Sequence, residues 1–470
     1  MAGRLSPAPP EPPRIGDGEL PAGLRGSEGL RKATHVGMGF IAFALRPLGP
    51  FWSAVLAALA LLFNLMLLPR IGGRRMWRQA ELAAGGAAGI VLYPLAVLLL
   101  ILIFHRRLEV AAAAWGILAF GDGLATVFGI ACGRRELPWN PRKSWVGSAA
   151  YVVFGTLAAA ALLLWTAPGQ GYSWRFALAA AAAAALLAAA LESVPQGLDD
   201  NLGVPLVAGL FLFGLVLTHG RWAAFLVPAT AWRLLLGAAV NATLAGVAYA
   251  ARTVDRSGVV AGFLLGTAIY LFLDWRGWLL LGAFFLIGSA CTKLGYRAKA
   301  AARLAQVSGG RRGARHALAN GGVAAACALF AALTPEPVLF RLAFAAALAT
   351  AAADTASSEI GQLLGRRTFL ITTLRPVPRG TEGAVSLEGT LAGIAASLLV
   401  AAVGAAVGLL TWGNTLLVAI AALAGCLCES IVGATLERRG LLDNEALNFL
   451  NTLVGALAAV GLARLALAAL

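Results

Sequence analysis

Long apolar stretches separated by short polar segments are the dominant pattern along this chain. Most of the stretches approach or exceed the ~20 apolar residues that a helix needs to cross a bilayer. We therefore predict an all-α, polytopic transmembrane protein with about 12–15 spans in two halves. The stretches fall at residues 36–46, 50–68, 83–104, 110–131, 147–166, 175–193 and 204–218, and then at 225–249, 258–273, 277–292, 317–334, 338–354, 388–410, 415–433 and 447–468.

The composition agrees with a membrane protein. Of the 470 residues, 60% are hydrophobic and 13% are charged, whereas soluble chains average about 45–50% apolar and about 25% charged residues. Residues 1–28 are rich in Pro, Gly and charge, which predicts a disordered tail. We expect residues 29–222 and 223–470 to form two membrane domains.

The formal net charge is +15, and the basic residues cluster in short segments between the apolar stretches. This distribution is typical of the positive-inside bias of membrane proteins, so nucleic acid is not an expected partner. Basic loops also attract anionic head groups and nucleotide phosphates. We therefore expect a multi-pass protein of the bacterial inner membrane, with sites that face the cytoplasm and bind nucleotide and membrane lipid.

A weak internal repeat relates the two halves. In each half an acidic residue follows an apolar run, a Ser-x-x-Gly-Ser/Thr sequence opens the next helix, Glu-Ser closes a later helix, and an Asp-Asn pair follows. The first half has these features at Asp122, Ser144–Ser148, Glu192-Ser193 and Asp200-Asn201; the second has them at Asp354, Ser386–Thr390, Glu429-Ser430 and Asp443-Asn444.

Carboxylates at the ends of apolar helices are the candidate metal ligands. Mg²⁺ prefers oxygen ligands and is commonly held by one or two carboxylates together with substrate phosphates. Two acidic sites in each half meet that need: Asp122 with Asp199 or Asp200, and Asp354 with Asp443. Glu359, which shares a polar stripe with Asp354, is a further catalytic candidate. The alternative is that Asp122 and Asp354 are ordinary helix-end carboxylates in water.

The basic segment 140–148 is the candidate phosphate site of the first half. Backbone N–H groups at a helix start, with Arg and Lys beside them, bind anions well. The alternative is an ordinary positive-inside loop. His35 at the first helix is either an interfacial residue or a phosphate ligand. The candidates are His35, Arg142, Lys143, Ser144, Gly147, Ser148 and Asn201.

The second half offers a glycine-rich counterpart, because small residues let the backbone approach a ligand closely. This segment runs from Arg379 through the start of the helix near residue 388. The candidates are Asn320, Arg379, Gly380, Thr381, Ser386, Glu388, Gly389, Thr390 and Asn444.

These motifs resemble known families. Residues 30–220, through Arg31-Lys32-x-x-His35, Gly121-Asp122-Gly123, residues 140–148 and Asp199-Asp200-Asn201, look like phytol kinase and dolichol kinase of the CTP-dependent polyprenol kinase and phosphatidate cytidylyltransferase group. Val146 is a departure, because that group usually has Glu before Gly-Ser. One metal or phosphate contact of the group is therefore missing from the first half.

Residues 240–468 resemble the membrane family that includes plant phytyl-phosphate kinase. The resemblance is carried by Asn320-Gly321-Gly322, residues 353–361, residues 379–390 and Asp443-Asn444. Glu388 is present here, so this half preserves the pattern better.

Together the resemblances imply that an isoprenoid alcohol is phosphorylated by the first half and its monophosphate by the second. CTP would be the donor and Mg²⁺ the cofactor. The alternatives are a cytidylyltransferase of the CDP-lipid synthase type, a secondary transporter with internal repeats, or an inactive first half that serves as a scaffold.

Overall fold

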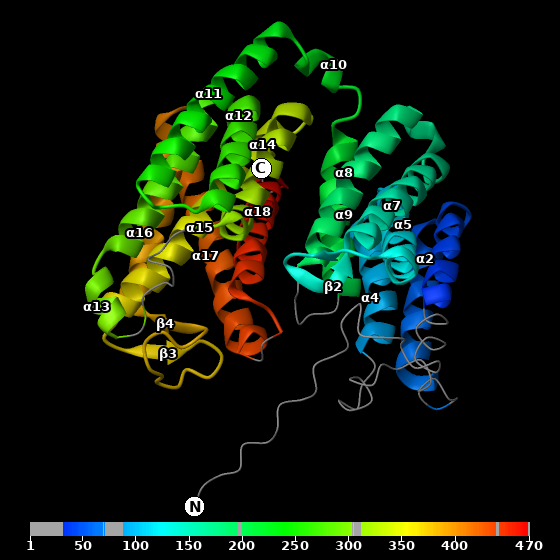
Figure 1. Cartoon of the computed structure of the whole chain (residues 1–470), viewed down its shortest axis with the longest axis horizontal. Helices are drawn as coiled ribbons and strands as arrows, with labels where there is room; N and C mark the ends of the chain where they lie inside the picture. Colours follow the sequence, from blue (N-terminus) through cyan, green and yellow to red (C-terminus); the bar gives the residue numbers. More distant parts are fainter. Residues whose placement is uncertain are drawn as a thin grey trace, which may run out of the picture. The chain divides into compact units, whose positions relative to one another are not determined.

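The computed structural model describes residues 32–68, 70, 88–194, 200–302, 304, 312–438 and 441–468. Predicted tail residues 1–28 and the candidate ligand Asp199 lie outside these ranges. The chain folds into two compact units, Met1–His219 and Gly220–Leu470, drawn blue to green and green to red in Figure 1.

The described residues contain 12 helices long and apolar enough to cross a membrane, and one shorter apolar helix at Ile90–Ile103. The all-α transmembrane prediction is thus confirmed. It missed two short antiparallel hairpins, β1 (Glu136–Leu137) with β2 (Asn140–Ser144) and β3 (Thr368–Leu370) with β4 (Ala384–Ser386). Strands this short show no alternating pattern that sequence analysis could detect.

The first unit is a bundle of α-helices. Its helices are α2 (Leu45–Leu62), α4 (Ala88–Ile103), α5 (Leu108–Gly116), α6 (Gly123–Cys132), α7 (Trp145–Thr166), α8 (Trp174–Ser193) and α9 (Asp200–Leu217). A π-helical turn, η4 (Ile117–Asp122), joins α5 to α6. The α7 helix packs on α5, α6 and α8, and α9 returns against α5.

The second unit is built around one long buried helix, α15 (Pro337–Leu364), whose middle is rich in alanine. Alanine at this position lets neighbouring helices approach closely. The helices that pack on α15 are α12 (Arg256–Lys293), α13 (Tyr296–Ala301), α14 (Ala314–Leu333), α16 (Leu387–Ala406), α17 (Asn414–Val432) and α18 (Asn444–Ala468), with the π-helical turn η7 (Gly433–Glu437) after α17. Helix α11 (Pro228–Ala250) packs on α12, and α10 (Trp222–Phe225) on α14.

Helix α12 reverses direction at Asp274, whose backbone lies at φ 51° and ψ −159°. Arg312 contacts both ends of α12: its carbonyl accepts from Asp255 N–H at 3.2 Å, and its guanidinium lies beside Gly288. A straight helix would separate those two ends by about 50 Å. The 258–273 and 277–292 stretches, predicted as separate helices, are therefore the two arms of one helical hairpin.

The reversal gives the second unit two distinct ends. Residue Arg312, the α12 termini and the β3–β4 hairpin lie at one end, and the Asp274 turn lies at the other. Figure 1 shows α13 and the hairpin at the lower end of this unit and α10 at its upper end.

Candidate functional site

The carboxylate of Asp122 closes the π-helical turn η4 and lies in an ion-paired cluster. The Lys32 ammonium donates to both of its oxygens, at 2.8 and 2.6 Å, and His35 Nε2 lies 3.7 Å away. The Lys32 and Asp122 side chains are only 8% and 19% exposed. π-Helical turns occur often at functional sites, because the extra residue redirects one side chain.

A second ion pair lies beside the first. Lys143, at the end of β2, pairs with the buried carboxylate of Glu192 near the end of α8. Burial of the Lys143 ammonium opposes its charged form, but the negative charges of Glu192, Asp122 and Asp200 outweigh burial and raise the pKa of Lys143 above its usual value. The four groups therefore share one electrostatic environment.

The β1–β2 hairpin is fixed over the end of α8 by two side chains. Asn140 Nδ2 donates to the Ser193 carbonyl at 2.9 Å, and Trp139 Nε1 donates to Ser193 Oγ at 3.1 Å. Because Ser193 follows Glu192, these bonds set the position of the Lys143–Glu192 pair. The sequence analysis expected a basic loop that leads into a helix; α7 does follow, beginning at Trp145, but residues 140–144 form the strand β2.

Ser144 ends that strand and caps α7. Its Oγ accepts a hydrogen bond from Gly147 N–H at 3.1 Å, as serine does at many helix starts. Gly129 and Gly133 of the preceding segment pack against this hydroxyl: a Cβ at Gly133 would lie 2.5 Å from Ser144 Oγ and 2.2 Å from the Gly129 carbonyl. Only glycine fits there.

The second unit repeats this local geometry. Ser386 caps α16 by accepting from Gly389 N–H at 3.1 Å. A Cβ at Gly365 would lie 2.4 Å from the Gly361 carbonyl and 3.1 Å from Ser386 Oγ. Gly361 follows Asp354 by seven residues, as Gly129 follows Asp122. The repeat seen in the sequence thus corresponds to the same acid, glycine and capping-serine arrangement in both units.

The carboxylates around Asp354 have few cationic partners among the described residues. Within the part of the chain that the structure describes, no hydrogen bond or ion pair is formed by the Asp354 side chain, and the basic residue within electrostatic range of it is His316. Glu429 lies within electrostatic range of Asp354 and of Glu437. This cluster differs from that of the first unit, where lysines neutralise the acids.

Two further acids complete the cluster. The Glu437 side chain, at the end of η7, is hydrogen-bonded to Glu382 and lies within electrostatic range of Asp354 and Asp443. The segment that carries Glu382 packs closely on η7: a Cβ at Gly383, which has φ +73°, would lie 2.5 Å from Ala434.

Several predicted residues of the second unit already have structural partners. Asp443 pairs with Arg315 and caps α18 by accepting from Ala446 N–H at 2.9 Å. Glu359 is buried with Lys299 in an ion pair whose side chains are 4% and 1% exposed. This pair joins α13 to α15.

The remaining predicted residues lie around the two capped helix starts or on neighbouring helices. Asn320 donates to the His316 carbonyl at 3.0 Å, and Glu388 accepts from Arg366 N–H at 3.2 Å. Thr390 Oγ1 donates to the Ser386 carbonyl at 2.9 Å, and Thr381 Oγ1 to the Pro378 carbonyl at 2.7 Å. Arg142, Arg379, Gly380 and Asn444 are exposed, Gly147 and Gly389 are buried, and Ser148 and Asn201 are half-buried.

Sequence reasoning assigned no role to five of the charged residues in these clusters. Lys32, Glu192 and Glu429 belonged to recognised motifs, but nothing in the sequence paired them with the acids. Glu382 lay within the 379–390 motif but was likewise unpaired, and Glu437 gave no signal beyond its charge. Among the described residues, no three His, Cys, Asp or Glu side chains come close enough to bind a metal by themselves.

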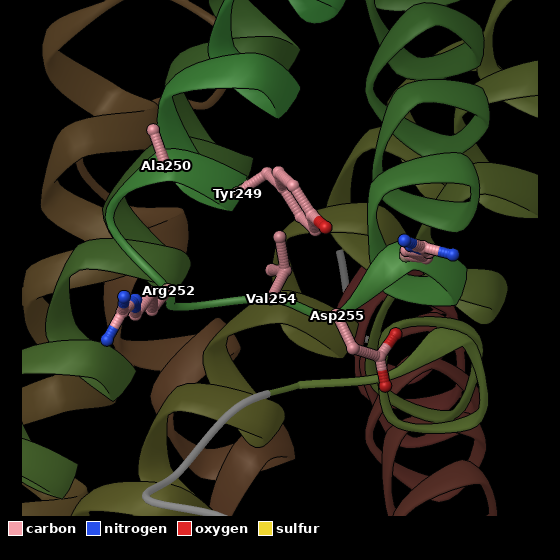
Figure 2. A pocket seen from close by; sticks show the side chains of 6 residues that line it. Tyr249, Ala250, Arg252, Val254 and Asp255 are labelled. Carbon is pink, nitrogen blue, oxygen red and sulfur yellow. The ribbon is translucent and has the colours of Figure 1, made fainter.

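A cavity of about 410 Å³ lies where α11 and α12 meet. Figure 2 shows Tyr249 and Asp255 beside it, with Arg252 pointing away from both. Hydrogen bonds from Ser257 and from Gly258 N–H lower the pKa of Asp255, which caps α12. The Asp255 carboxylate thus serves the start of α12.

Comparison with known proteins gives partial matches. Residues 239–456 match the family described as Integral membrane protein DUF92. An uncharacterized membrane protein of Synechocystis, sll0875, is 45% identical over 203 residues, covering 43% of this chain and 79% of that protein. Protein VTE6, chloroplastic, of Arabidopsis thaliana is 39% identical over 211 residues, covering 43% and 63%.

A kinase is also among the relatives. Phytol kinase 1, chloroplastic, of Arabidopsis thaliana is 33% identical over 157 residues, which cover 32% of this chain and 49% of that protein. The chain thus spans about half the length of this kinase. No solved structure matches.

Proposed function

The chain belongs to the integral membrane protein family DUF92, and on that premise we propose that its two units phosphorylate an isoprenoid lipid in two consecutive steps. The first unit converts an isoprenoid alcohol to the monophosphate, and the second converts the monophosphate to the diphosphate. CTP is the phosphoryl donor. The similarity to a phytol kinase and the resemblances to phytol, dolichol and phytyl-phosphate kinases support this assignment.

The observation that carries the proposal is the repeated arrangement of acid, glycine and capping serine. In both units a carboxylate stands seven residues before a glycine, and that glycine packs on the serine that opens the next helix. The starts of α7 and α16 thus lie about two helical turns, ~10 Å, along the helix from Asp122 and Asp354. Free backbone N–H groups at a helix start bind phosphate oxygens, and the opposing carboxylate suits a metal–phosphate complex.

Cationic side chains flank both helix starts. In the first unit these are Lys143 and Arg142, and in the second Arg379, whose charge acts on Glu388 in the first turn of α16. Arginine binds phosphate through two parallel hydrogen bonds, and lysine supplies a compact charge. These groups orient the nucleotide and neutralise charge that develops on the transferred phosphoryl group.

The carboxylates fit Mg²⁺ better in the second unit than in the first. Asp354 lacks a partner among the described residues, whereas Asp122 is held by Lys32. Mg²⁺ needs only one or two protein carboxylates when phosphates supply other ligands. Asp354 and Glu429 would hold it in the second unit, and Asp122 with Asp200 in the first. When bound, Mg²⁺ supplies positive charge to the nucleotide phosphates.

In the first step the alcohol oxygen forms a bond to the γ-phosphorus of CTP, and the bond from that phosphorus to the β-phosphate oxygen breaks. CDP leaves, and the hydroxyl proton is released. In the second step an oxygen of the monophosphate dianion attacks a second CTP in the same way, with no proton to remove. Positioning therefore supplies much of the rate in both steps.

Separate variants test whether each unit catalyses one of the two phosphorylation steps. Asp122→Asn and Asp354→Asn are assayed with CTP on geranylgeraniol and on geranylgeranyl phosphate, with Asp274→Asn as the control at the other end of the second unit. We expect Asp122→Asn to abolish monophosphate formation only, and Asp354→Asn to abolish diphosphate formation only. Undiminished conversion of the monophosphate by Asp354→Asn would refute the assignment of the second unit.

A further inference from the structure

The second unit contains a cavity of about 540 Å³ at the end opposite the Asp354 cluster. It is formed where α10 and the start of α11 meet the Asp274 turn of α12 and the α14–α15 connection. Four arginines on these separate segments line it: Arg221, Arg233, Arg276 and Arg341.

Arginines outnumber carboxylates among the described residues that line this cavity, by four to one. Among the described residues, none of the four guanidinium groups forms an ion pair. Asp274, the acid in the lining, accepts from Arg276 N–H at 2.9 Å and thereby stabilises the turn. The neighbouring Glu336 is paired with Arg464 at 3.1 Å.

The position of the four arginines is unusual for a membrane protein. The other end of the unit carries the basic segments around Arg312, Arg366 and Arg379, and one end of a membrane bundle normally holds most of the basic residues. Isolated arginines at a helix end extend to the interface individually. Four that converge on one cavity repel one another, so a bound anion would stabilise the arrangement.

The cavity also has an apolar wall. The rings of Phe225 and Phe272 stack with centroids 5.5 Å apart, and Ala331 and Leu409 line the cavity beside them. A phosphate group bound by the arginines would therefore place an attached hydrocarbon chain along apolar surface. Arginine forms bidentate hydrogen bonds to phosphate, and basic pockets between membrane helices are suited to anionic head groups.

We propose that this cavity, lined by Arg221, Arg233, Arg276 and Arg341, binds the phosphate of an anionic amphiphile at the membrane surface opposite the Asp354 cluster. The bound lipid stabilises the Asp274 turn and the packing of α10 and α11 on it. This site is independent of the proposed kinase activity, because it lies at the other end of the bundle.

The test measures lipid retention by the full-length chain. Purified protein is delipidated and exchanged into micelles that contain phosphatidylglycerol and phosphatidylcholine in equal amounts, and the bound lipids are counted by native mass spectrometry. The variants are Arg276→Gln with Arg341→Gln, and Arg221→Gln with Arg233→Gln. The control is Arg175→Gln, because the Arg175 guanidinium lies over the neighbouring Trp174 ring at 5.4 Å, as Arg276 lies over Trp275 at 5.6 Å.

Each double variant should lower the preference for phosphatidylglycerol about tenfold or more, because each removes two charge-assisted hydrogen bonds. The control should retain the wild-type preference. If inorganic phosphate at millimolar concentration displaces the lipid, the site also accepts the free anion. An unchanged preference in both double variants, or an equal loss in Arg175→Gln, would overturn the proposal. Two pairs are used so that one poorly folded variant does not decide the outcome.

Discussion

The buried Lys299–Glu359 ion pair makes a sharp stability prediction. The Lys299 ammonium also donates to the carbonyls of Cys291 at 3.2 Å and Thr292 at 3.0 Å. It therefore fastens α13, the end of α12 and α15 at a single buried point. Replacing Lys299 by Met removes all three bonds and leaves the Glu359 carboxylate buried without its counter-charge.

Breaking a buried ion pair by removing one partner costs about 3–5 kcal/mol, because the remaining charge is not compensated. For a unit of this size that loss corresponds to a fall in the thermal midpoint of about 6–20 °C. The double variant Lys299→Met with Glu359→Leu removes both charges. It should recover part of the loss, because no buried charge is left without its counter-charge. The recovery should be incomplete, because each of the two carbonyls still lacks its donor, at a cost of about 1–3 kcal/mol for each group that stays buried.

Thermal unfolding of the purified chain in detergent, followed by circular dichroism, measures both effects. Lys293→Met is the matched control, because Lys293 is exposed near the end of α12, and it should change stability by less than about 0.5 kcal/mol. The reasoning is refuted if Lys299→Met behaves like this control, or if the double variant is less stable than Lys299→Met. Loss of the second phosphorylation step from folded double variant would show that Glu359 is catalytic.

Two other predictions follow from the capped helix starts. Gly133→Ala and Gly365→Ala should each lower the activity of their own unit at least about tenfold, because the new methyl group overlaps its neighbours and displaces the capping serine. The control is Gly169→Ala, because Gly169 faces open space, and activities equal to those of this control would contradict the packing argument. The pKa of Lys143 is raised in the folded protein above its ordinary value of 10.5. The ion pair therefore contributes its full stability below about pH 10.5, and this contribution is lost as the pH rises through the pKa of the folded state. The difference in thermal stability between wild type and Lys143→Met should therefore stay constant from pH 8 to about pH 10; a decline within that window would contradict the assignment.

The sequence predicted the helices well, because spans of ~20 apolar residues are a strong signal. Their repeated order in the sequence also singled out Asp122, Asp354 and the two serines that cap α7 and α16. It did not reveal that Lys32 lies against Asp122, because the two residues are 90 positions apart. Tertiary pairing of this kind leaves no local pattern, and the same holds for the four arginines that come from separate segments to line one cavity.

Glu359 illustrates a different limit. Its place on a polar stripe beside Asp354 suggested catalysis, but the structure shows the side chain buried against Lys299. A carboxylate in a membrane helix is energetically costly unless it is paired. The sequence therefore indicates that Glu359 has a partner, but it does not indicate whether that partner is a protein side chain or a ligand. The distinction between a structural pair and a site ligand depends on the fold.

The fate of the phosphorus atoms of CTP tests the central claim most directly. Purified protein is incubated with geranylgeraniol, Mg²⁺ and CTP labelled either at the γ-phosphate or at the α-phosphate, and lipid and nucleotide products are separated. We predict γ-label in the lipid monophosphate and diphosphate, with CDP as the released nucleotide. Transfer of the α-label to lipid with release of pyrophosphate, or the absence of any labelled lipid, would contradict the account.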